Sequence, residues 1–510
     1  MNWKIEMDWN NDGVYEVDEV ARLKSLHIER GRESLFEDPM IGYCDLVLGN
    51  YDGRYDAWKA DSPFYPHVAP GAKVKISVII GGNTYALFTG RVMDPKSSRI
   101  KASNADPVGE FRQFVLRIHD GWQWLLDQEI SVALVQNTTT QAAIQAALNA
   151  SGFVQAAGLW LVGSGQLDST TVLGGLYGEN LSLGSNVGDV IPYWWVEKEP
   201  VSQNILDLVR SNFGRVQING DGQFVFSSRT NDNGSASSFT LTDSMLQEMQ
   251  VSYPWQEVKN QVRIRVTPRA LAALGTVWQN AETIYLGSGE SQTIQAEYRD
   301  PTTGEFSPAI NLVSPVATTD YTANDNSDGS GVNRTANLGV TMTAYSSYAN
   351  IVIVNNASVP IYVTLLKVRG QLVTGLKEQS VYSEDAYSKE RYGRKLYETD
   401  LRWQQKTLVA QDLADWIVSF QKEPKDVLEI QWESAENAVK YELGTKITDG
   451  TTKGAGGTYR ISKITHDLVD DQGAQKLITR WKCLRHPTDT YWQLDSETVS
   501  QLGVSAVLGI

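Results

Sequence analysis

The sequence predicts a mainly β protein with a few helices, an α+β fold in which the strands form two barrels and a sandwich. Short runs of alternating polar and apolar residues recur along most of the chain, separated by turns rich in Gly, Asn and Asp. The 15 Trp and 22 Tyr, against 12 Phe, suit half-buried sheet surfaces where one end of the ring stays wet. Helical spacing of apolar residues is confined to a few short segments, so strands are expected to dominate.

The chain of 510 residues is long enough for about three or four domains. A hydrophobic content of 41% with 21% charged residues predicts packed cores rather than disorder. Composition and turn spacing divide the chain into a first barrel domain (1–128), a mixed α/β region (129–260), an inserted or peripheral β-sandwich (261–377), a unit of helices plus a second barrel (378–490) and a C-terminal tail (491–510).

The first barrel domain begins with a hairpin, because residues 1–20 alternate on both sides of a polar turn. The elements expected after it are, in chain order, a strand at 43–48, a hairpin turned at 81–83, a strand at 111–119, and a helix over 121–128 capped by Asp120.

The rest of the chain is expected to alternate helices and strands. In chain order, the expected elements are a Thr-capped helix over 139–149, an aromatic strand or interface patch over 190–196, a helix capped by Ser202, a hairpin over 216–229, a strand at 260–266, helices over 383–392 and 407–421, and strands between 427 and 486. Between 270 and 377 a turn falls about every 8 to 12 residues, which is typical of a β-sandwich. The last helix and its strands repeat the barrel-plus-helix content of the first domain.

The net charge of −15 argues against a general nucleic-acid binder, which needs a basic surface. Cys44 and Cys483 lie in apolar, strand-like runs and are expected to be buried thiols rather than a disulfide framework. The first residues lack the pattern of a signal peptide, and no window approaches the apolar length of a membrane span. We therefore expect a protein made in a cytoplasm, without a transmembrane segment.

The first turn offers a candidate metal site. Asp8, Asn10, Asp12 and Glu19 follow the oxygen-ligand spacing of a calcium-binding loop, so Ca²⁺ is a possible ligand. The alternative is a hairpin turn in which Asn, Asp and Gly bond their own backbone. The flanking segments read as strands, whereas an EF-hand needs helices.

The loop over 54–70 is the most unusual stretch of the first domain. It carries three prolines and is rich in aromatic residues, a composition typical of loops that contact another surface. The interface candidates are Tyr55, Trp58, Phe64, Tyr65 and His67.

No motif points to catalysis. The five histidines show no metal-ligand spacing, and the sequence has no nucleophile elbow, phosphate-binding loop or dinucleotide fingerprint. We therefore expect that the chain is not an enzyme and has no cofactor besides the possible Ca²⁺.

The order of several short motifs resembles minor tail proteins of long-tailed phages and prophages, in the family of tail-tip or baseplate hubs. The motifs are D-x-N-x-D-G near the start, RLKSLHIERGR at 22–32, NYDGRY at 50–55, SPFYP at 62–66, LFTG at 87–90, NILDLVRSNFGRVQINGDGQFVF at 204–226, VRG at 368–370 and YRISKITHDL at 459–468. Together they span most of the chain.

The resemblance implies a hub with two tube-like barrels per subunit, so that three subunits give six barrels and match a hexameric tail tube. It implies a homotrimer that contacts other tail proteins (the distal tail or tube ring, the tape measure, and tip or fibre proteins), with DNA only in transit. Such a protein is synthesised in the host cytoplasm and located at the virion tail tip. The chain shows no fibre, coiled coil or lytic domain.

On this interpretation the loop over 54–70 is a contact arm, with Tyr55, Trp58, Phe64 and Tyr65 buried by partner chains. The net charge predicts an acidic lumen that repels the DNA backbone. Two alternatives stay open: a carbohydrate-binding host-recognition protein that uses the 270–377 sandwich, and a virion-associated cell-wall hydrolase.

Overall fold

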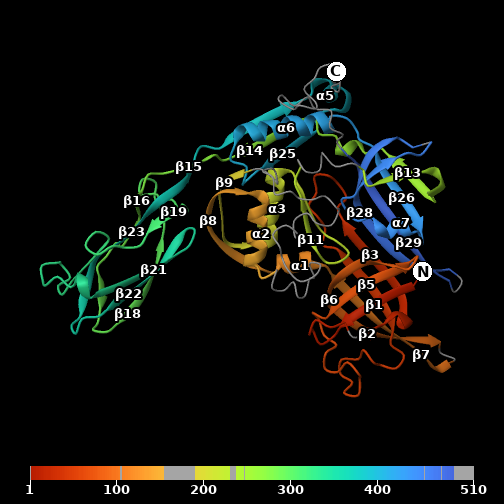
Figure 1. The fold of residues 1–510 in the computed structure, drawn as a ribbon, viewed down its shortest axis with the longest axis horizontal. Helices are drawn as coiled ribbons and strands as arrows, with labels where there is room; N and C mark the ends of the chain where they lie inside the picture. Colours follow the sequence, from red (N-terminus) through yellow and green to blue (C-terminus); the bar gives the residue numbers. More distant parts are fainter. Residues whose placement is uncertain are drawn as a thin grey trace.

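The computed structural model describes residues 2–15, 17–103, 106–153, 190–229, 237–245, 247–452, 454–471 and 474–486. The fold is mainly β with a few helices, as predicted. Figure 1 shows an arch, with the inserted sandwich as one limb and the N-terminal and C-terminal strands together as the other. The expected tail at 491–510 lies outside the described residues, and the domain boundaries at 128, 260 and 377 stay predictions.

The N-terminal strands form one half of the largest sheet. They are β1 (Asn2–Asp8), β2 (Val17–Asp18), β3 (Leu23–Gly31), β4 (Tyr43–Gly49), β5 (Lys73–Ile80), β6 (Asn83–Ser103) and β7 (Asp106–His119). They pair in the order β3-β4-β7-β6-β5-β1-β2. Alternate side chains point to one face, where Ile5, Leu46, Val74 and Phe88 are fully buried in a shared core.

The C-terminal strands form the other half of the same sheet. They are β12 (Phe239–Leu241), β13 (Glu248–Ser252), β26 (Val427–Glu433), β27 (Lys446–Asp449), β28 (Gly457–Asp471) and β29 (Ala474–Arg485), with the short helix α7 (Glu436–Lys440). Trp432 and Trp481 pack against each other in the core of this half, with ring centroids 4.9 Å apart.

The two halves are joined by the antiparallel pairing of β3 with β28, which places Asp467 opposite His27. The prediction of two barrels is therefore corrected: the strands that the structure describes make one 13-stranded sheet, whose main path runs from β13 to β2 while β27 and β12 branch from β28. The physical reason lies in the edge strands, whose backbone N–H and C=O groups need partners. A closed barrel would pair them within each half, whereas here each half pairs one edge with the other half.

The central region packs helices against a two-stranded ribbon and a hairpin. Its elements are α1 (Gly121–Leu126), β8 (Glu129–Thr139), α2 (Thr140–Ala150), β9 (Val190–Pro200), α3 (Val201–Asn212), β10 (Arg215–Ile218) and β11 (Phe224–Ser227). The predicted caps are confirmed for two helices, because Asp120 accepts from Trp122 N and Thr139 accepts from Ala142 N. Ser202 is not a cap: α3 begins one residue earlier, after Pro200.

A small sheet and two helices connect this region to the sandwich. The elements are β14 (Gln261–Val266), β24 (Gln379–Glu384), α5 (Ala386–Tyr392), β25 (Leu396–Asp400) and α6 (Thr407–Gln421). Helix α6 buries Leu413 and Ile417 against β14, as its apolar spacing predicted. The start of the helix expected at 383–392 is corrected, because residues 383 and 384 belong to β24.

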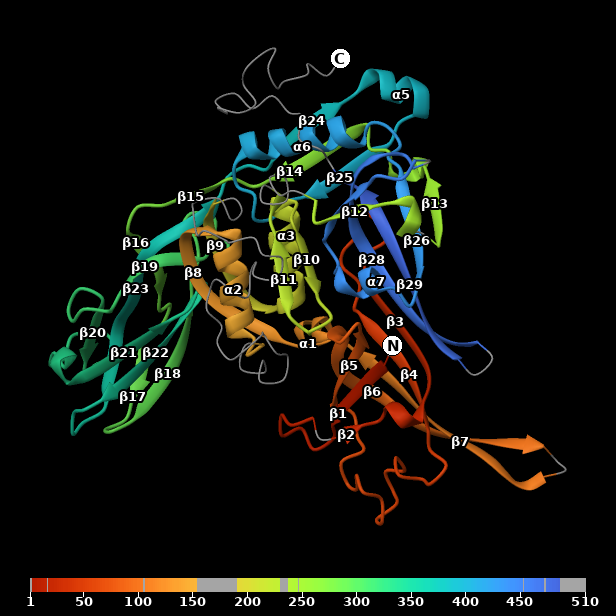
Figure 2. The same cartoon turned by 45° about the vertical axis from the view of Figure 1, so that its right-hand side comes forward.

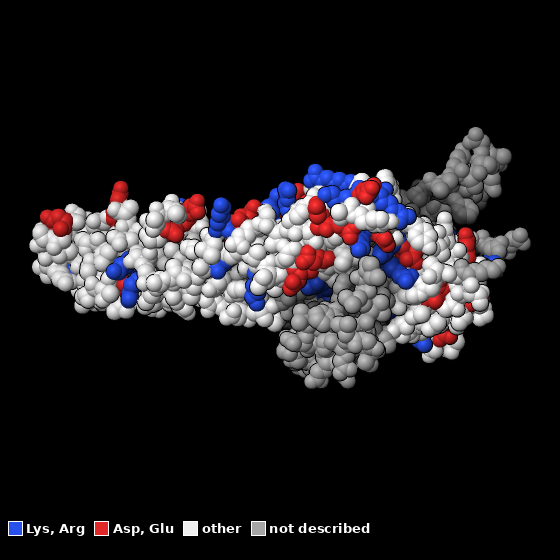
Figure 3. All heavy atoms as spheres, turned by 90° about the horizontal axis from the view of Figure 1, so that it is seen from above, with Lys and Arg blue, Asp and Glu red and all other residues white. Residues whose placement is uncertain are grey.

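The inserted limb is a sandwich of a six-stranded and a three-stranded sheet. Its strands are β15 (Arg269–Leu271), β16 (Gly275–Gln279), β17 (Ile284–Leu286), β18 (Ser291–Glu297), β19 (Ala309–Val313), β20 (Tyr321–Asn324), β21 (Leu338–Ala344), β22 (Tyr348–Asn355) and β23 (Ile361–Gly375). Every strand of the larger sheet pairs with β23. Charged side chains are sparse on the face of this limb seen in Figure 3 and gather over the middle of the molecule.

Candidate interface surfaces

The loop over 54–70 divides its aromatic residues between the core and the solvent. Tyr55 is 1% exposed and Phe64 is 8% exposed. Both pack within the chain: Tyr55 stacks on Phe114 with ring centroids 4.7 Å apart, and Phe64 lies 5.6 Å from Trp9. The prediction that partner chains bury these two residues is therefore corrected, because the chain's own core already covers them.

The other three candidates of this loop do face the solvent. Trp58 is 69% exposed, Tyr65 is 48% exposed, and His67 is exposed. Neighbouring Tyr51 is exposed as well, beneath the guanidinium of Arg22 at 4.6 Å from its ring centroid. A role of these residues in contacts between subunits stays a prediction.

Hydrogen bonds fix the shape of this loop. Five successive turns run from Asn50 to Tyr65, each closed by an N–H that donates to the carbonyl three residues earlier. The Tyr55 hydroxyl donates to the buried carboxylate of Glu19 at 2.5 Å, and Arg22 binds Asp52 through two nitrogens. Burial, together with Glu19, raises the pKa of Tyr55 above its usual range. These hydrogen bonds therefore hold the backbone of the loop in the conformation that exposes Trp58 and Tyr65.

Three of the four candidate calcium ligands share one turn. Asp8 is buried, and its carboxylate accepts from the Lys73 ammonium at 2.9 Å and from the backbone of Asp12 and Gly13. The Asn10 amide donates to Asp12, which accepts from Val14 N, so both side chains serve the turn. Glu19 pairs instead with Tyr55 and Arg54. Each of these side chains has a partner within the chain, and Ca²⁺ binding stays a prediction.

A ribbon formed by β6 and β7 projects beyond the sheet (Figure 2). Strand β5 pairs with β6 only between Asn83 and Arg91, and β4 pairs with β7 only between Gln113 and His119. Beyond these points β6 and β7 pair only with each other, up to Ser103 and Asp106. A two-stranded ribbon is marginally stable alone, so this one is a candidate contact arm.

The sequence did not predict this ribbon. The strand expected at 111–119 covers only the part of β7 that pairs with the sheet. Pro95 and Pro107 interrupt the rest of the pattern, and a proline within a run of residues argues against a strand. The one sequence signal for a hairpin is the polar run at 103–106, which separates two stretches of similar length.

The two ends of the large sheet differ. At the β1 end, Ile5 N donates to the side chain of Asp18 at 3.1 Å, and Ile5 O accepts from Glu19 N at 2.9 Å, so part of this edge is blocked. The β13 end is followed by Tyr253 and Trp255, which are both exposed. An edge strand with exposed aromatic neighbours is a second candidate surface.

Polar side chains hold the two halves of the sheet together along β3 and β28. Arg30 is buried and binds the Glu442 carboxylate through two nitrogens at 2.7 and 2.9 Å. The His27 Nδ1 lies 2.6 Å from Asp467 Oδ1. These pairs join residues from opposite ends of the chain.

His466 and the two cysteines serve packing. His466 is buried with its Nδ1 2.9 Å from Thr479 Oγ1; burial, aided by the nearby Arg30 guanidinium, lowers the pKa of His466 to about 3. Cys44 and Cys483 are buried free thiols, as predicted. Across the described residues there is no group of three or more acidic, His or Cys side chains arranged to hold a metal ion. In the same residues, no helix has the length and apolar character that crossing a membrane requires.

Comparison with known proteins found similarity in solved structures only. No family model matches the chain, and no curated protein does. A tail protein from Neisseria meningitidis is 10% identical, with 94% of this chain and 97% of that chain covered and a TM-score of 0.47. The 43 kDa tail protein of prophage MuSo2 from Shewanella oneidensis is 12% identical, with 94% and 98% covered and a TM-score of 0.45.

A third similar structure is prophage tail protein gp18 from Listeria monocytogenes, 9% identical, with 94% of each chain covered and a TM-score of 0.39. All three are tail proteins, and two of them come from prophages. The TM-scores of these three structures all lie below 0.5.

Proposed function

We propose that this chain is a structural, non-enzymatic protein of a phage tail tip, where it forms a hub ring that caps or continues the tail tube. The observation that carries the proposal is the pairing of β3 with β28, which joins strands from opposite ends of the chain into one sheet. The order of motifs along the sequence supports the same function.

A sheet of this kind suits the wall of a ring. Each copy contributes two halves of the sheet, so three copies contribute six and match the sixfold symmetry of a tube. The sheet leaves an edge at β13, where a neighbouring copy is able to continue the wall. The homotrimer is thus the expected assembly, in the tail tip of the virion, with DNA passing through its lumen.

Two features are suited to contacts with other tail proteins. The β6–β7 ribbon extends beyond the sheet, and the loop over 54–70 exposes Trp58 and Tyr65. Aromatic side chains are enriched at the centres of protein interfaces. The proposed partners are the tube ring, the tape measure, and the tip or fibre proteins that the hub organises for host attachment and DNA ejection.

The mass of the purified protein tests this function. Light scattering of the chain alone and with tube protein is expected to show a species with three times the mass of one chain, or one that becomes trimeric on the tube. A chain that stays monomeric and never joins a tail would contradict the proposal. A pull-down with glycans separates the carbohydrate-binding alternative, because a hub alone is expected to retain none.

A further inference from the structure

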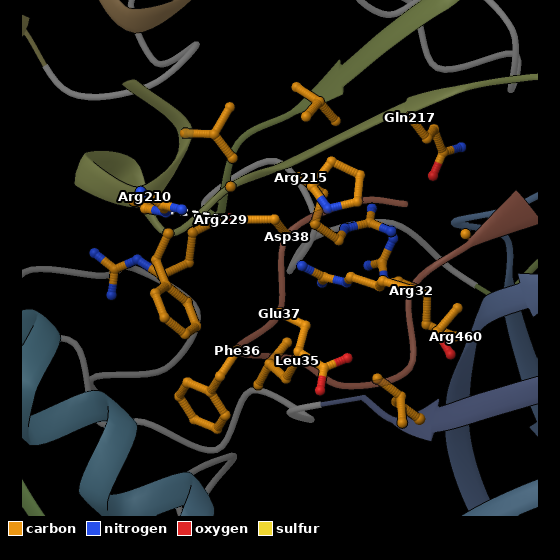
Figure 4. A pocket seen from close by; sticks show the side chains of 18 of the residues that line it. Arg32, Leu35, Phe36, Glu37, Asp38, Arg210, Arg215, Gln217, Arg229 and Arg460 are labelled. Atoms are coloured by element: carbon orange, nitrogen blue, oxygen red, sulfur yellow. Dashed lines mark hydrogen bonds and ion pairs between the residues drawn. The ribbon is translucent and has the colours of Figure 1, made fainter. Parts of the chain in front are cut away.

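A cavity lies where the large sheet, the central region and helix α6 meet. Its walls come from the loop that follows β3, the end of α3 with β10, and the ends of β28 and β29. These segments are distant in the sequence, and Figure 4 shows their side chains converging on one space.

The lining carries more positive than negative charge. Six arginines contribute to it: Arg32, Arg210, Arg215, Arg229, Arg460 and Arg485. The carboxylates are Glu37 and Asp38. Asp38 binds Arg210, and Arg485 binds Asp426, which lies outside the lining. In Figure 4 the side chains of Arg32 and Arg215 extend into the middle of the cavity. This concentration of guanidinium groups is notable in a chain with a net charge of −15.

One wall of the cavity is aromatic. Phe36 and Phe213 meet edge to face with centroids 5.8 Å apart, and Phe213 meets Trp416 in the same way at 5.2 Å. The guanidinium of Arg229 lies 5.5 Å from the Trp416 ring centroid. The cavity therefore combines an apolar surface with planar cationic groups, which bind carboxylates through two parallel hydrogen bonds.

We propose that this cavity binds an acidic peptide segment of a partner protein, with carboxylates on the arginines and an apolar side chain on the aromatic wall. A peptide fits better than a DNA backbone for two reasons: the cavity is recessed between three parts of the chain, and phosphates would leave the aromatic wall unused. This peptide-binding site is separate from the proposed hub function. Only the expectation that the partner is a tail protein rests on that function.

The test uses the full-length protein and a fluorescein-labelled peptide that alternates Asp or Glu with Leu. The matched control peptide has Asn and Gln in place of the acids. Fluorescence anisotropy is expected to show the acidic peptide binding about tenfold more tightly, and more weakly as NaCl rises from about 50 to about 300 mM. Equal binding of the two peptides, or no binding, would overturn the proposal.

A double variant, Arg32→Gln with Arg215→Gln, locates the binding. It is expected to weaken the acidic peptide at least about tenfold, since each guanidinium supplies charge-assisted hydrogen bonds. The matched control, Arg263→Gln with Arg299→Gln, removes two exposed arginines outside the cavity and is expected to leave binding within about twofold. Unchanged binding in the first variant would overturn the proposal.

A crosslinking measurement keeps the test decisive if the double variant does not fold. A photoreactive group on the peptide is expected to label residues 31–39 or 206–217 of the unmodified protein, and labelling only elsewhere would contradict the site. Stronger binding of a short DNA duplex, lost in the same variant, would replace the peptide with a nucleic acid. Peptide binding by a strictly monomeric chain would support this site and contradict only the hub.

Discussion

At the scale of the residue, similar side chains in one loop have opposite environments. Tyr55 and Trp58 are three positions apart in a loop without regular secondary structure, and the sequence treats them alike. The successive turns direct Tyr55 into the core and Trp58 into the solvent. The difference depends on Trp9, directly after β1, and on Phe114 of β7, which are both distant in sequence or in strand order from the loop they contact.

The Tyr55 hydroxyl is expected to stabilise the fold through buried Glu19. Tyr55→Phe removes a donor to that carboxylate and is expected to lower the free energy of unfolding by about 1–3 kcal/mol. Urea unfolding measures the change. The control is Tyr51→Phe, an exposed tyrosine next to the same loop, which is expected to change little. Equal losses in both variants would contradict this role.

His466 is expected to make stability depend on pH. Its folded-state pKa is about 3, below the ordinary value of 6.5, so below pH 6.5 the unfolded chain binds a proton that the folded chain does not. Stability is therefore full above pH 6.5 and falls toward pH 3, by up to about 1.4 kcal/mol per pH unit from this group.

The comparison of wild type with His466→Gln tests this dependence. Urea unfolding at about pH 7.5 and about pH 4.5 is expected to show a smaller loss in the variant, because Gln does not titrate. His67→Gln, at an exposed position, is the control and is expected to follow the wild type. A variant as acid-sensitive as the wild type would show that His466 is not responsible.

At the scale of the element, the outer part of the β6–β7 ribbon is expected to be needed for assembly but not for folding. Its outer part forms pairs only within itself, whereas Phe114, where the ribbon joins the sheet, is buried. The outer part therefore adds no strand pairing to the rest of the sheet, and its length is better explained by a partner.

Replacement of residues 100–111 by Asn-Gly is expected to keep the fold and to prevent assembly. The new turn joins Arg99 to Arg112, which already face each other, and Asn-Gly suits a tight hairpin. Arg112 stays in the variant because its carbonyl accepts from Asn50 N. The midpoint of urea unfolding is expected to change little, while co-sedimentation with tube protein is lost. Normal co-sedimentation of the shortened protein would show that the ribbon is not a contact arm.

At the scale of the whole molecule, the β3–β28 pairing determines the architecture. It makes one sheet from segments that are more than 400 residues apart, as the His27–Asp467 separation of 440 shows. The buried Arg30 guanidinium needs its carboxylate partner there, because an unpaired buried charge is costly.

Glu442→Gln is therefore expected to destabilise the whole protein. The loss is about 3 kcal/mol, since the variant weakens the two charge-assisted hydrogen bonds of the buried Arg30 guanidinium. Asp45→Asn is the matched control: it breaks the exposed pair with Arg117 and is expected to cost about 0–1 kcal/mol. Similar midpoints of urea unfolding in both variants would contradict the importance of the buried pair.

The sequence by itself determined the local structure of this protein. Alternation, turn residues and caps predicted the mainly β class, the caps at Asp120 and Thr139, the apolar face of α6 and the sandwich-like spacing after 270, because these depend on neighbours in the chain. The buried cysteines followed from the apolar character of their strands.

Only the tertiary structure decided how the strands join and which side chains remain exposed. The pairing of β3 with β28, the extent of the ribbon, the burial of Tyr55 and Phe64, and the gathering of six arginines depend on residues far apart in sequence. The alternation of residues in a strand specifies which side chains face the core, but it does not specify which strand lies beside it. For that reason the barrels predicted from local patterns became two halves of one sheet.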